Sequence, residues 1–203
     1  TETNKYSEYY VSPPLGSDQT HYQDMNLTPL SILKLFGRAT YSFEARAKAS
    51  RLIEETKPDI AYIHNIYNYM SPSIIDAFAH HNIPTVMRVS DYNLVCPSHD
   101  LIRDAHVCSE CLDHGYLRAM RHRCVKASFP ATLARVASMY VHRWLKVYQK
   151  VHVFVTPSDF MRKILIRAGF DQERTVHLPS FYIPQNGELE TGTENRYVLY
   201  FGR

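Results

Sequence analysis

Two polar pairs each follow an apolar run in the segment 60–96. His64 and Asn65 close the first run, and Ser90 and Asp91 close the second. A helical pattern separates the runs, so the segment predicts a β-α-β unit with parallel strands. Because ligands of open parallel sheets bind just beyond the carboxyl ends of the strands, these residues are the first candidates for a ligand site. The alternatives are that Asp91 caps a helix or a turn, and that His64 and Asn65 are loop residues whose polar groups are already hydrogen-bonded.

The helix between the two runs has clear end signals. Ser71 is expected as its N-cap, because a serine hydroxyl can accept from an unpaired backbone N–H. Pro72 is expected at the first helical position, where a missing N–H costs nothing. Asn82 is expected at the carboxyl end, and Pro84 leads into the second strand.

All four cysteines of the chain lie within the segment 96–126, at Cys96, Cys108, Cys111 and Cys124. One C-x2-C pair with two outlying cysteines is typical of a tetrahedral thiolate site, and zinc is the metal that fits it best. Such a zinc would be structural, because four protein ligands leave no open position for catalysis. The alternatives are free reduced thiols and a redox or iron–sulfur role. Four histidines nearby could also serve as ligands: His99, His106, His114 and His122.

The segment 96–126 has no clean periodicity, and we interpret it as a Cys-rich insertion. Its basic residues would either face solvent or meet a phosphate on a lipid-linked acceptor or a membrane surface. These residues are Arg118, Arg121, His122, Arg123 and Lys126.

Composition limits the class of protein. The chain has 203 residues, of which 45% are hydrophobic and 21% charged, with a net charge of +3. These values are ordinary for a globular domain, and the charge is too small to argue for nucleic acid. The sequence shows no transmembrane run, signal peptide, G-x-G-x-x-G or P-loop pattern.

The rest of the chain continues the alternation of helices and strands. Residues 1–28 are expected as loop and residues 41–56 as helix. Residues 131–150 are expected as one amphipathic helix, with Leu133, Val136, Tyr140 and Trp144 on one face. That helix either packs on the core or presents a basic amphipathic surface to anionic lipid. Strands are expected at 151–158 and 175–178, with a helix between them that Ser158 caps and Gly169 ends. Together these elements predict a doubly wound, Rossmann-like parallel sheet with helices on both faces.

Several segments taken in order resemble the N-terminal half of family 4 glycosyltransferases, which are retaining enzymes of the GT-B type. The segments are KPDIAYIHN, SPSIIDAFAHHNIP, SDYNLVCPS, VTPSDFMRKILIRAGF, LPSF and the final YVLYFGR. The resemblance covers about residues 58–203. Relatives often carry His-Asp where this chain has Ser90 and Asp91. Ser90 cannot be a general base near neutral pH, so the role of this position departs from the family pattern.

The resemblance implies a domain organisation and a reaction. Residues 1–190 would form an acceptor-side domain that lacks its first part, and residues 191–203 a linker and the first strand of a donor-binding domain. The chain would transfer a sugar, with retention, from a UDP-, GDP- or ADP-sugar to a glycan or lipid-linked acceptor. The departing phosphate would be stabilised by electrostatics, and no divalent metal is expected to be required. The segment alone is expected to be inactive, because the family's acidic E-x7-E segment and phosphate-binding Arg/Lys pair would lie beyond Arg203.

The resemblance also assigns roles to single residues. Asp91 and Ser90 would be catalytic, and Asp91 would accept hydrogen bonds from sugar or acceptor hydroxyls. The substrate-binding residues would be His64, Asn65, Ser158 and Arg203. The protein would act in the cytoplasm, with possible peripheral contact at the inner membrane face.

Two other functions remain open. A zinc-stabilised module could dock a protein or a nucleic acid through its basic cluster, although no recognition helix or regular zinc-finger spacing supports nucleic acid. A sugar-nucleotide epimerase or a dehydrogenase would also use a Rossmann-like sheet, but a dehydrogenase would need a G-x-G-x-x-G loop.

Overall fold

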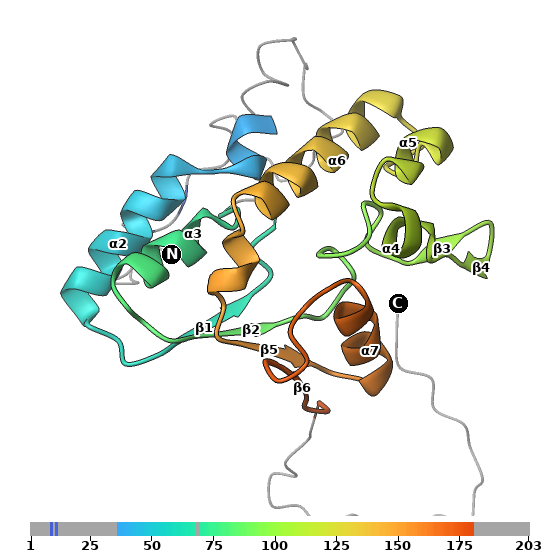
Figure 1. Cartoon of the computed structure of the whole chain (residues 1–203). Coiled ribbons are helices and arrows are strands. Elements are labelled where there is room, and N and C mark those ends of the chain that lie inside the picture. The colour runs from blue at the N-terminus through green and yellow to red at the C-terminus, as the bar shows by residue number, and fades with distance from the viewer. Residues whose placement is uncertain (1–8, 10, 12–35, 68–69, 181–203) are drawn as a thin grey trace, which may run out of the picture.

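The computed structural model describes residues 9, 11, 36–67 and 70–180. Within these ranges the chain is an α/β protein with a four-stranded sheet (Figure 1). The strands are β1 (Ala61–His64), β2 (Thr85–Arg88), β5 (Val153–Thr156) and β6 (Thr175–His177). They lie in the order β1-β2-β5-β6, and every pair is parallel. The predicted α/β class and parallel sheet are therefore confirmed.

The register of the sheet brings the carboxyl ends of the strands to one edge. His64 at the end of β1 pairs with Arg88 at the end of β2, and Arg88 pairs with Val155. Thr156 at the end of β5 pairs with His177 at the end of β6. Side chains that follow these residues consequently meet at the same edge of the sheet.

The core lies around the central strands. Ile63, Met87 and Phe154 are buried side chains from three neighbouring strands. Ile75 and Leu165 add fully buried side chains from two helices. Each such side chain contributes roughly 1.5–3 kcal/mol through its burial. The core therefore fixes the strands and, with them, the edge where they end.

Two helices stack beside β1. Helices α2 (Phe43–Thr56) and α3 (Ser73–His80) lie together at one end of the molecule (Figure 1). Ser42 caps α2, because its hydroxyl accepts a hydrogen bond from the Ala45 N–H at 3.1 Å. The predicted helix at residues 41–56 is confirmed to within two residues at its start.

Helix α3 begins differently from the prediction. Pro72 is the N-cap residue, and Ser71 lies one residue earlier with a left-handed φ of 54°. The Ser71 hydroxyl still accepts from the Ser73 N–H at 3.3 Å, and it also accepts from the Ser42 N–H at 2.8 Å. Ser71 is thus wrongly predicted as the N-cap, because its hydroxyl joins the starts of two helices. Asn82, with a φ of 56°, follows the helix end as expected.

The predicted helix at residues 131–150 is two elements. Helix α6 (Phe129–Trp144) is followed by the 3-10 helix η3 (Val147–Lys150). Lys146 interrupts them with a left-handed φ of 52°. The predicted apolar face is partly wrong: Val136 is buried, but Leu133, Tyr140 and Trp144 are exposed, and Trp144 is 81% exposed. The buried face of α6 instead carries polar residues, among them Thr132 and His142.

Helix α7 (Asp159–Arg167) lies between β5 and β6, as predicted. The Ser158 hydroxyl accepts from the Met161 N–H at 3.2 Å and caps the helix. Gly169 follows the helix with a φ of 94°, a conformation that residues other than glycine rarely adopt.

The segment between β2 and α6 forms a small lobe on one side of the molecule (Figure 1). Its elements are β3 (Ile102–Arg103), β4 (His106–Val107), α4 (Glu110–His114) and α5 (Arg118–His122). The two strands form an antiparallel pair.

Some predictions fall on residues that the structure does not describe. These are most of the loop at 1–28 and the linker and strand expected at 191–203, which include Arg203. Gly37 lies inside a helical turn at 36–40. In the part of the chain that the structure describes, we find no helix with both the length and the apolar character needed to cross a lipid bilayer.

Candidate functional site

A group of polar side chains is linked by hydrogen bonds at the carboxyl edge of the sheet. Ser90 Oγ lies 3.0 Å from His64 Nε2 and accepts from Arg88 Nε at 3.3 Å. Arg88 Nη2 donates to Ser180 Oγ at 2.8 Å. We call His64, Arg88, Ser90 and Ser180 the edge cluster. It joins the ends of β1 and β2 to the segment after β6, and it brings together the predicted residues His64 and Ser90.

Asp91 is turned toward its own loop. Its Oδ1 accepts from the Asn93 N–H at 3.0 Å, and its Oδ2 accepts from Asn93 Nδ2 at 2.8 Å. Such a bond to the backbone two residues later stabilises a turn. The structure therefore gives Asp91 a turn-stabilising role, which was one of the two alternatives. Its predicted catalytic role stays a prediction.

The other predicted substrate-binding residues that the structure describes, Asn65 and Ser158, have no side-chain hydrogen bond to the edge cluster. Asn65 follows β1 with a left-handed φ of 54°. Ser158 uses its hydroxyl to cap α7. Arg203 is outside the described residues. Among the predicted site residues, only His64 and Ser90 have a hydrogen bond between them in the part that the structure describes.

Sequence reasoning missed Arg88, which donates two of the three hydrogen bonds in the edge cluster. A signal was present, because Arg88 is the only charged residue in an otherwise apolar run. A charged residue at the end of a buried strand is rarely there for packing.

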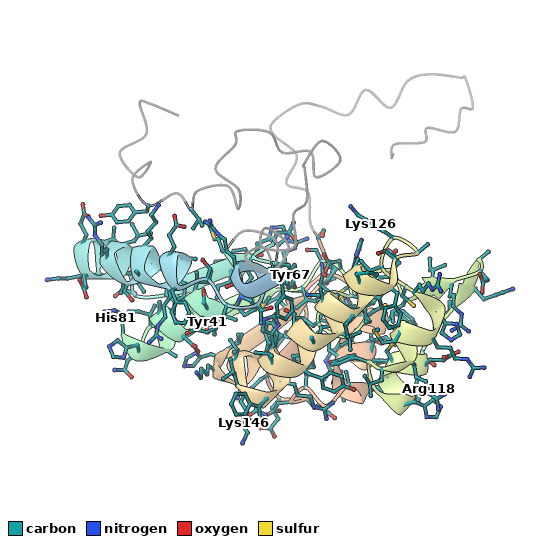
Figure 2. The ribbon with its side chains drawn as sticks, turned by 90° about the horizontal axis from the view of Figure 1, so that it is seen from above. Tyr41, Tyr67, His81, Arg118, Lys126 and Lys146 are labelled. Atoms are coloured by element: carbon teal, nitrogen blue, oxygen red, sulfur yellow. The ribbon has the colours of Figure 1, made fainter. Side chains whose placement is uncertain are left out.

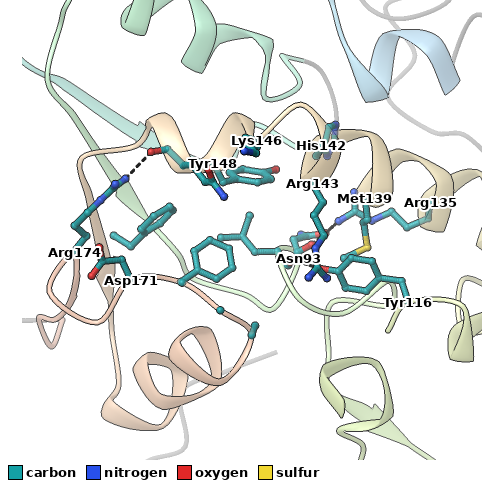
Figure 3. Close-up of a pocket in the computed structure, with 16 residues that line it drawn as sticks. Asn93, Tyr116, Arg135, Met139, His142, Arg143, Lys146, Tyr148, Asp171 and Arg174 are labelled. Atoms are coloured by element: carbon teal, nitrogen blue, oxygen red, sulfur yellow. Dashed lines mark hydrogen bonds between the residues drawn. The ribbon is translucent and has the colours of Figure 1, made fainter. Parts of the chain in front are cut away.

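A large cavity lies under α6 (Figure 3). Its volume is about 600 Å³, a size that suits small organic ligands. We call it the α6 cavity. Its lining comes from the loop after β2, the lobe, α6 and η3, β5, and the turn between α7 and β6. The residues are Asn93, Leu94, Tyr116, Arg135, Met139, His142, Arg143, Lys146, Tyr148, Gln149, Phe154, Ala168, Gly169, Phe170, Asp171 and Arg174.

Hydrogen bonds connect the cavity wall to the loop that carries Asp91. Arg135 Nη2 donates to the Asn93 carbonyl at 2.6 Å and to Asn93 Oδ1 at 3.1 Å. Tyr67 lies near both regions, at the centre of the molecule (Figure 2), and its hydroxyl is buried without a hydrogen-bond partner in the described residues. Burial chiefly raises the Tyr67 pKa, with smaller contributions from Tyr148 and Asp91. Tyr67 therefore stays protonated.

His142 forms part of the buried wall of the α6 cavity. Its Nε2 donates to the Thr40 carbonyl at 2.7 Å. Burial lowers the His142 pKa to about 4, although the bond to Thr40 acts in the opposite direction. His142 is therefore neutral at physiological pH and adds no charge to the cavity.

The four cysteines are free thiols within electrostatic range of one another. Burial chiefly raises the Cys111 pKa to about 12, and the charges of Cys96, Cys124 and Cys108 add to the effect. Nevertheless, no three His, Cys, Asp or Glu side chains in the described ranges form a group that could hold a metal ion. The thiol donors suit zinc in chemical type, but this arrangement is not a formed metal centre.

Compared with known proteins, the chain matches no family model, no curated protein and no solved structure. The resemblance to family 4 glycosyltransferases therefore rests on the sequence segments alone and stays a prediction.

Proposed function

We propose that the chain is the acceptor-side, Rossmann-like half of a glycosyltransferase of the GT-B type that acts on a nucleotide-sugar. The observation that carries the proposal is the edge cluster. It lies at the carboxyl ends of adjacent parallel strands, the edge at which open α/β sheets bind ligands. The sequence segments that resemble family 4 glycosyltransferases, and their order along the chain, also support the proposal.

In this proposal the edge cluster acts through charge and hydrogen bonds. The Arg88 guanidinium is always positive and can donate to phosphate oxygens in a planar pair. His64 and Ser90 can meet sugar hydroxyls, with Ser90 held between His64 and Arg88. Donors that are already aimed when the phosphate leaves stabilise its charge without reorganisation. The proposed role of Asp91 is to shape this loop through Asn93; its carboxylate would also accept a hydrogen bond from a sugar hydroxyl.

The test uses the natural full-length protein. It is incubated with a panel of UDP-, GDP- and ADP-sugars, release of nucleoside diphosphate is followed, and thermal stability is measured with each compound. We expect one nucleotide-sugar both to stabilise the protein and to be consumed. If none stabilises folded protein, the proposal fails.

A structural zinc in the lobe is a second proposal, and the mutual proximity of the four thiols favours it. Against it stands the absence of a formed metal group in the described residues. Elemental analysis of protein purified without added metal tests it: about one zinc per chain, lost in Cys111→Ser, supports the site. Zinc-free protein that keeps the same melting temperature after treatment with a chelator rules it out.

The zinc-stabilised docking module stays the alternative function. The surface hollow lined by Glu110, His114, Arg118, Arg121 and His122 would be its contact face. Within it, Glu110 already pairs with His122 at 3.1 Å and with Arg103 at 2.7 Å, which reduces the charge available to a partner. Binding of a nucleic acid that weakens with salt would favour this alternative.

A further inference from the structure

The α6 cavity carries an excess of positive charge that the described residues do not balance. Four cations line it, namely Arg135, Arg143, Lys146 and Arg174, against one carboxylate, Asp171. His142 adds no charge to the cavity, because its imidazole is neutral.

Two of these cations are committed to the protein. Arg135 donates to Asn93, as described above. Arg174 Nη2 donates to the Gln149 carbonyl at 2.8 Å and also to the Val151 carbonyl (Figure 3). These bonds fix the two side chains but leave their charge in place. Arg174 Nε is buried and has no hydrogen-bond partner in the described residues.

The other two cations are available to a ligand. The side chains of Arg143 and Lys146 form no hydrogen bond or ion pair with any residue that the structure describes, although their backbone groups do form hydrogen bonds. Both are exposed at the mouth of the cavity. Figure 3 shows Arg143 beside Tyr116 at one end and Arg174 with Asp171 at the other. Burial raises the pKa of Tyr116, and the nearby charge of Arg143 lowers it by a smaller amount.

The inner wall of the cavity is apolar and aromatic. Leu94, Met139 and Phe154 are buried, and Tyr148 and Phe170 are half-buried. A wall of this kind accepts an aromatic ring or a short alkyl chain. The combined surface suits a molecule with an apolar body and an anionic head.

We propose that the α6 cavity binds an organic phosphate monoester whose apolar or aromatic body lies on this wall and whose phosphate meets Arg143 and Lys146. A phosphate dianion fits better than a carboxylate, because one negative charge would leave most of the excess positive charge unbalanced. The site is separate from the edge cluster, so this proposal does not depend on sugar transfer.

The test measures binding by calorimetry to the natural full-length protein. The probes are phenyl phosphate, octyl phosphate and inorganic phosphate, with octyl glucoside as an uncharged control. We expect saturable binding of an organic phosphate that is tighter than binding of inorganic phosphate and that weakens as NaCl is added.

Three variants locate the binding. Arg143→Gln with Lys146→Gln is expected to weaken it about tenfold, because two charge-assisted contacts are lost. Arg51→Gln with Lys57→Gln removes the same charge from exposed positions outside the cavity lining and should leave binding unchanged. Asp171→Asn should strengthen binding about threefold, because it removes the nearby negative charge and keeps Oδ1, which accepts from the Glu173 N–H.

The source of the phosphate is decided by a further arm with vesicles. Binding to vesicles that contain phosphatidic acid, without binding to vesicles of phosphatidylcholine alone, would show that the ligand is a lipid headgroup. For this conclusion, the variant at Arg143 and Lys146 must abolish the vesicle binding. Binding of soluble phosphates without vesicle binding would assign a free ester. The proposal is overturned if no organic phosphate binds, or if the cavity variant and the control variant bind equally well.

Discussion

At the carboxyl edge of the sheet, polar side chains form hydrogen bonds with one another, whereas the side chains of two cations in the α6 cavity form none with the described residues. His64, Ser90, Arg88 and Ser180 form a continuous chain of hydrogen bonds. Arg143 and Lys146 leave their charge open at the cavity mouth. A group that is already bonded is held in place before a ligand arrives. An unbalanced charge in a partly apolar cavity instead gains from a ligand that neutralises it.

The two regions share one support. Asn93 accepts from Arg135 in the cavity wall and donates to Asp91 beside the edge cluster. We call the hydrogen bonds of Asn93 to Asp91 and Arg135 the bridge. A substitution that breaks the bridge should therefore affect both regions, whereas a substitution far from the bridge should affect only one region.

The largest expected effect is a loss of stability at low pH, and it is caused by His142 in the buried wall of the α6 cavity. Its pKa of about 4 in the folded chain lies below its ordinary value of 6.5. Between these two pH values the unfolded chain binds more protons than the folded chain. The stability that His142 contributes is therefore fully present above pH 6.5 and is lost as the pH is lowered toward 4. The loss is about 3 kcal/mol from this residue. Chemical unfolding followed between pH 7.5 and pH 4 measures it.

The matched variant for this prediction is His142→Gln, which removes the titrating ring. Other groups titrate in both proteins, so the difference between the two pH profiles isolates His142. The variant should show the smaller loss of stability on acidification. Parallel profiles would mean that His142 does not carry the pH dependence.

The second prediction concerns the edge cluster. Arg88→Gln removes the charge and the forked donor that reach Ser90 and Ser180. If the edge cluster meets the donor or acceptor, kcat/KM for sugar transfer should fall about a hundredfold, as when an oriented donor is removed from a charged transition state. Initial rates with the best nucleotide-sugar measure this change.

Two controls make the result specific. Arg51→Gln removes a charge from the exposed side of α2 and should leave the rate unchanged. Arg88→Lys should recover only part of the activity, since an ammonium lacks the planar fork. If Arg88→Gln has the same rate as the wild type, the edge cluster is not part of the catalytic site.

The edge cluster was partly predictable because its signals are local. Apolar runs locate the strands, and His64 and Ser90 follow them directly in the sequence. Ser158 and Gly169 were predicted for the same reason, since capping depends on residues within one turn. Arg88 was overlooked because it lies inside an apolar run, and its partner Ser180 is distant in the sequence.

The α6 cavity could not be predicted from the sequence. Its wall combines five separate segments, and no local pattern states that they converge. The helical period of α6 predicted one apolar face, but only Val136 of that predicted face is buried. Polar Thr132 and His142 lie on the buried face because the carbonyls of Ser128 and Thr40 satisfy them, at 2.7 Å in each case. The apolar residues Leu133 and Trp144 lie outside.

The third prediction tests the bridge between the two regions. Asp91→Ala removes two hydrogen bonds to Asn93 and should lower the free energy of unfolding by about 1 kcal/mol. Asn93→Ala removes one of these bonds and the Asn93 Oδ1 contact with Arg135. Because the residues interact, the double variant should lose less stability than the sum of the two single losses. Urea unfolding of the four proteins gives the coupling.

Activity of the same variants separates the two roles of Asp91. If Asp91 only shapes the loop, Asp91→Ala and Asn93→Ala should slow sugar transfer to a similar extent. A far larger loss in Asp91→Ala, at similar stability, would mean that its carboxylate touches the substrate. In that case the bridge would be part of the catalytic site and not only its support.

The smallest effect on stability is expected on the outer face of α6, opposite the cavity wall. Trp144 is 81% exposed, so Trp144→Ser should change the free energy of unfolding by less than about 0.5 kcal/mol. Phe129, Leu133 and Tyr140 are also exposed on this helix, and aromatic residues beside cations favour a membrane interface. If this face meets a membrane, Trp144→Ser should weaken sedimentation with anionic vesicles while leaving phenyl phosphate binding in the cavity intact. Equal sedimentation of both proteins would exclude this face as a membrane contact, and an accompanying loss of phenyl phosphate binding would show that the two faces of α6 are not independent.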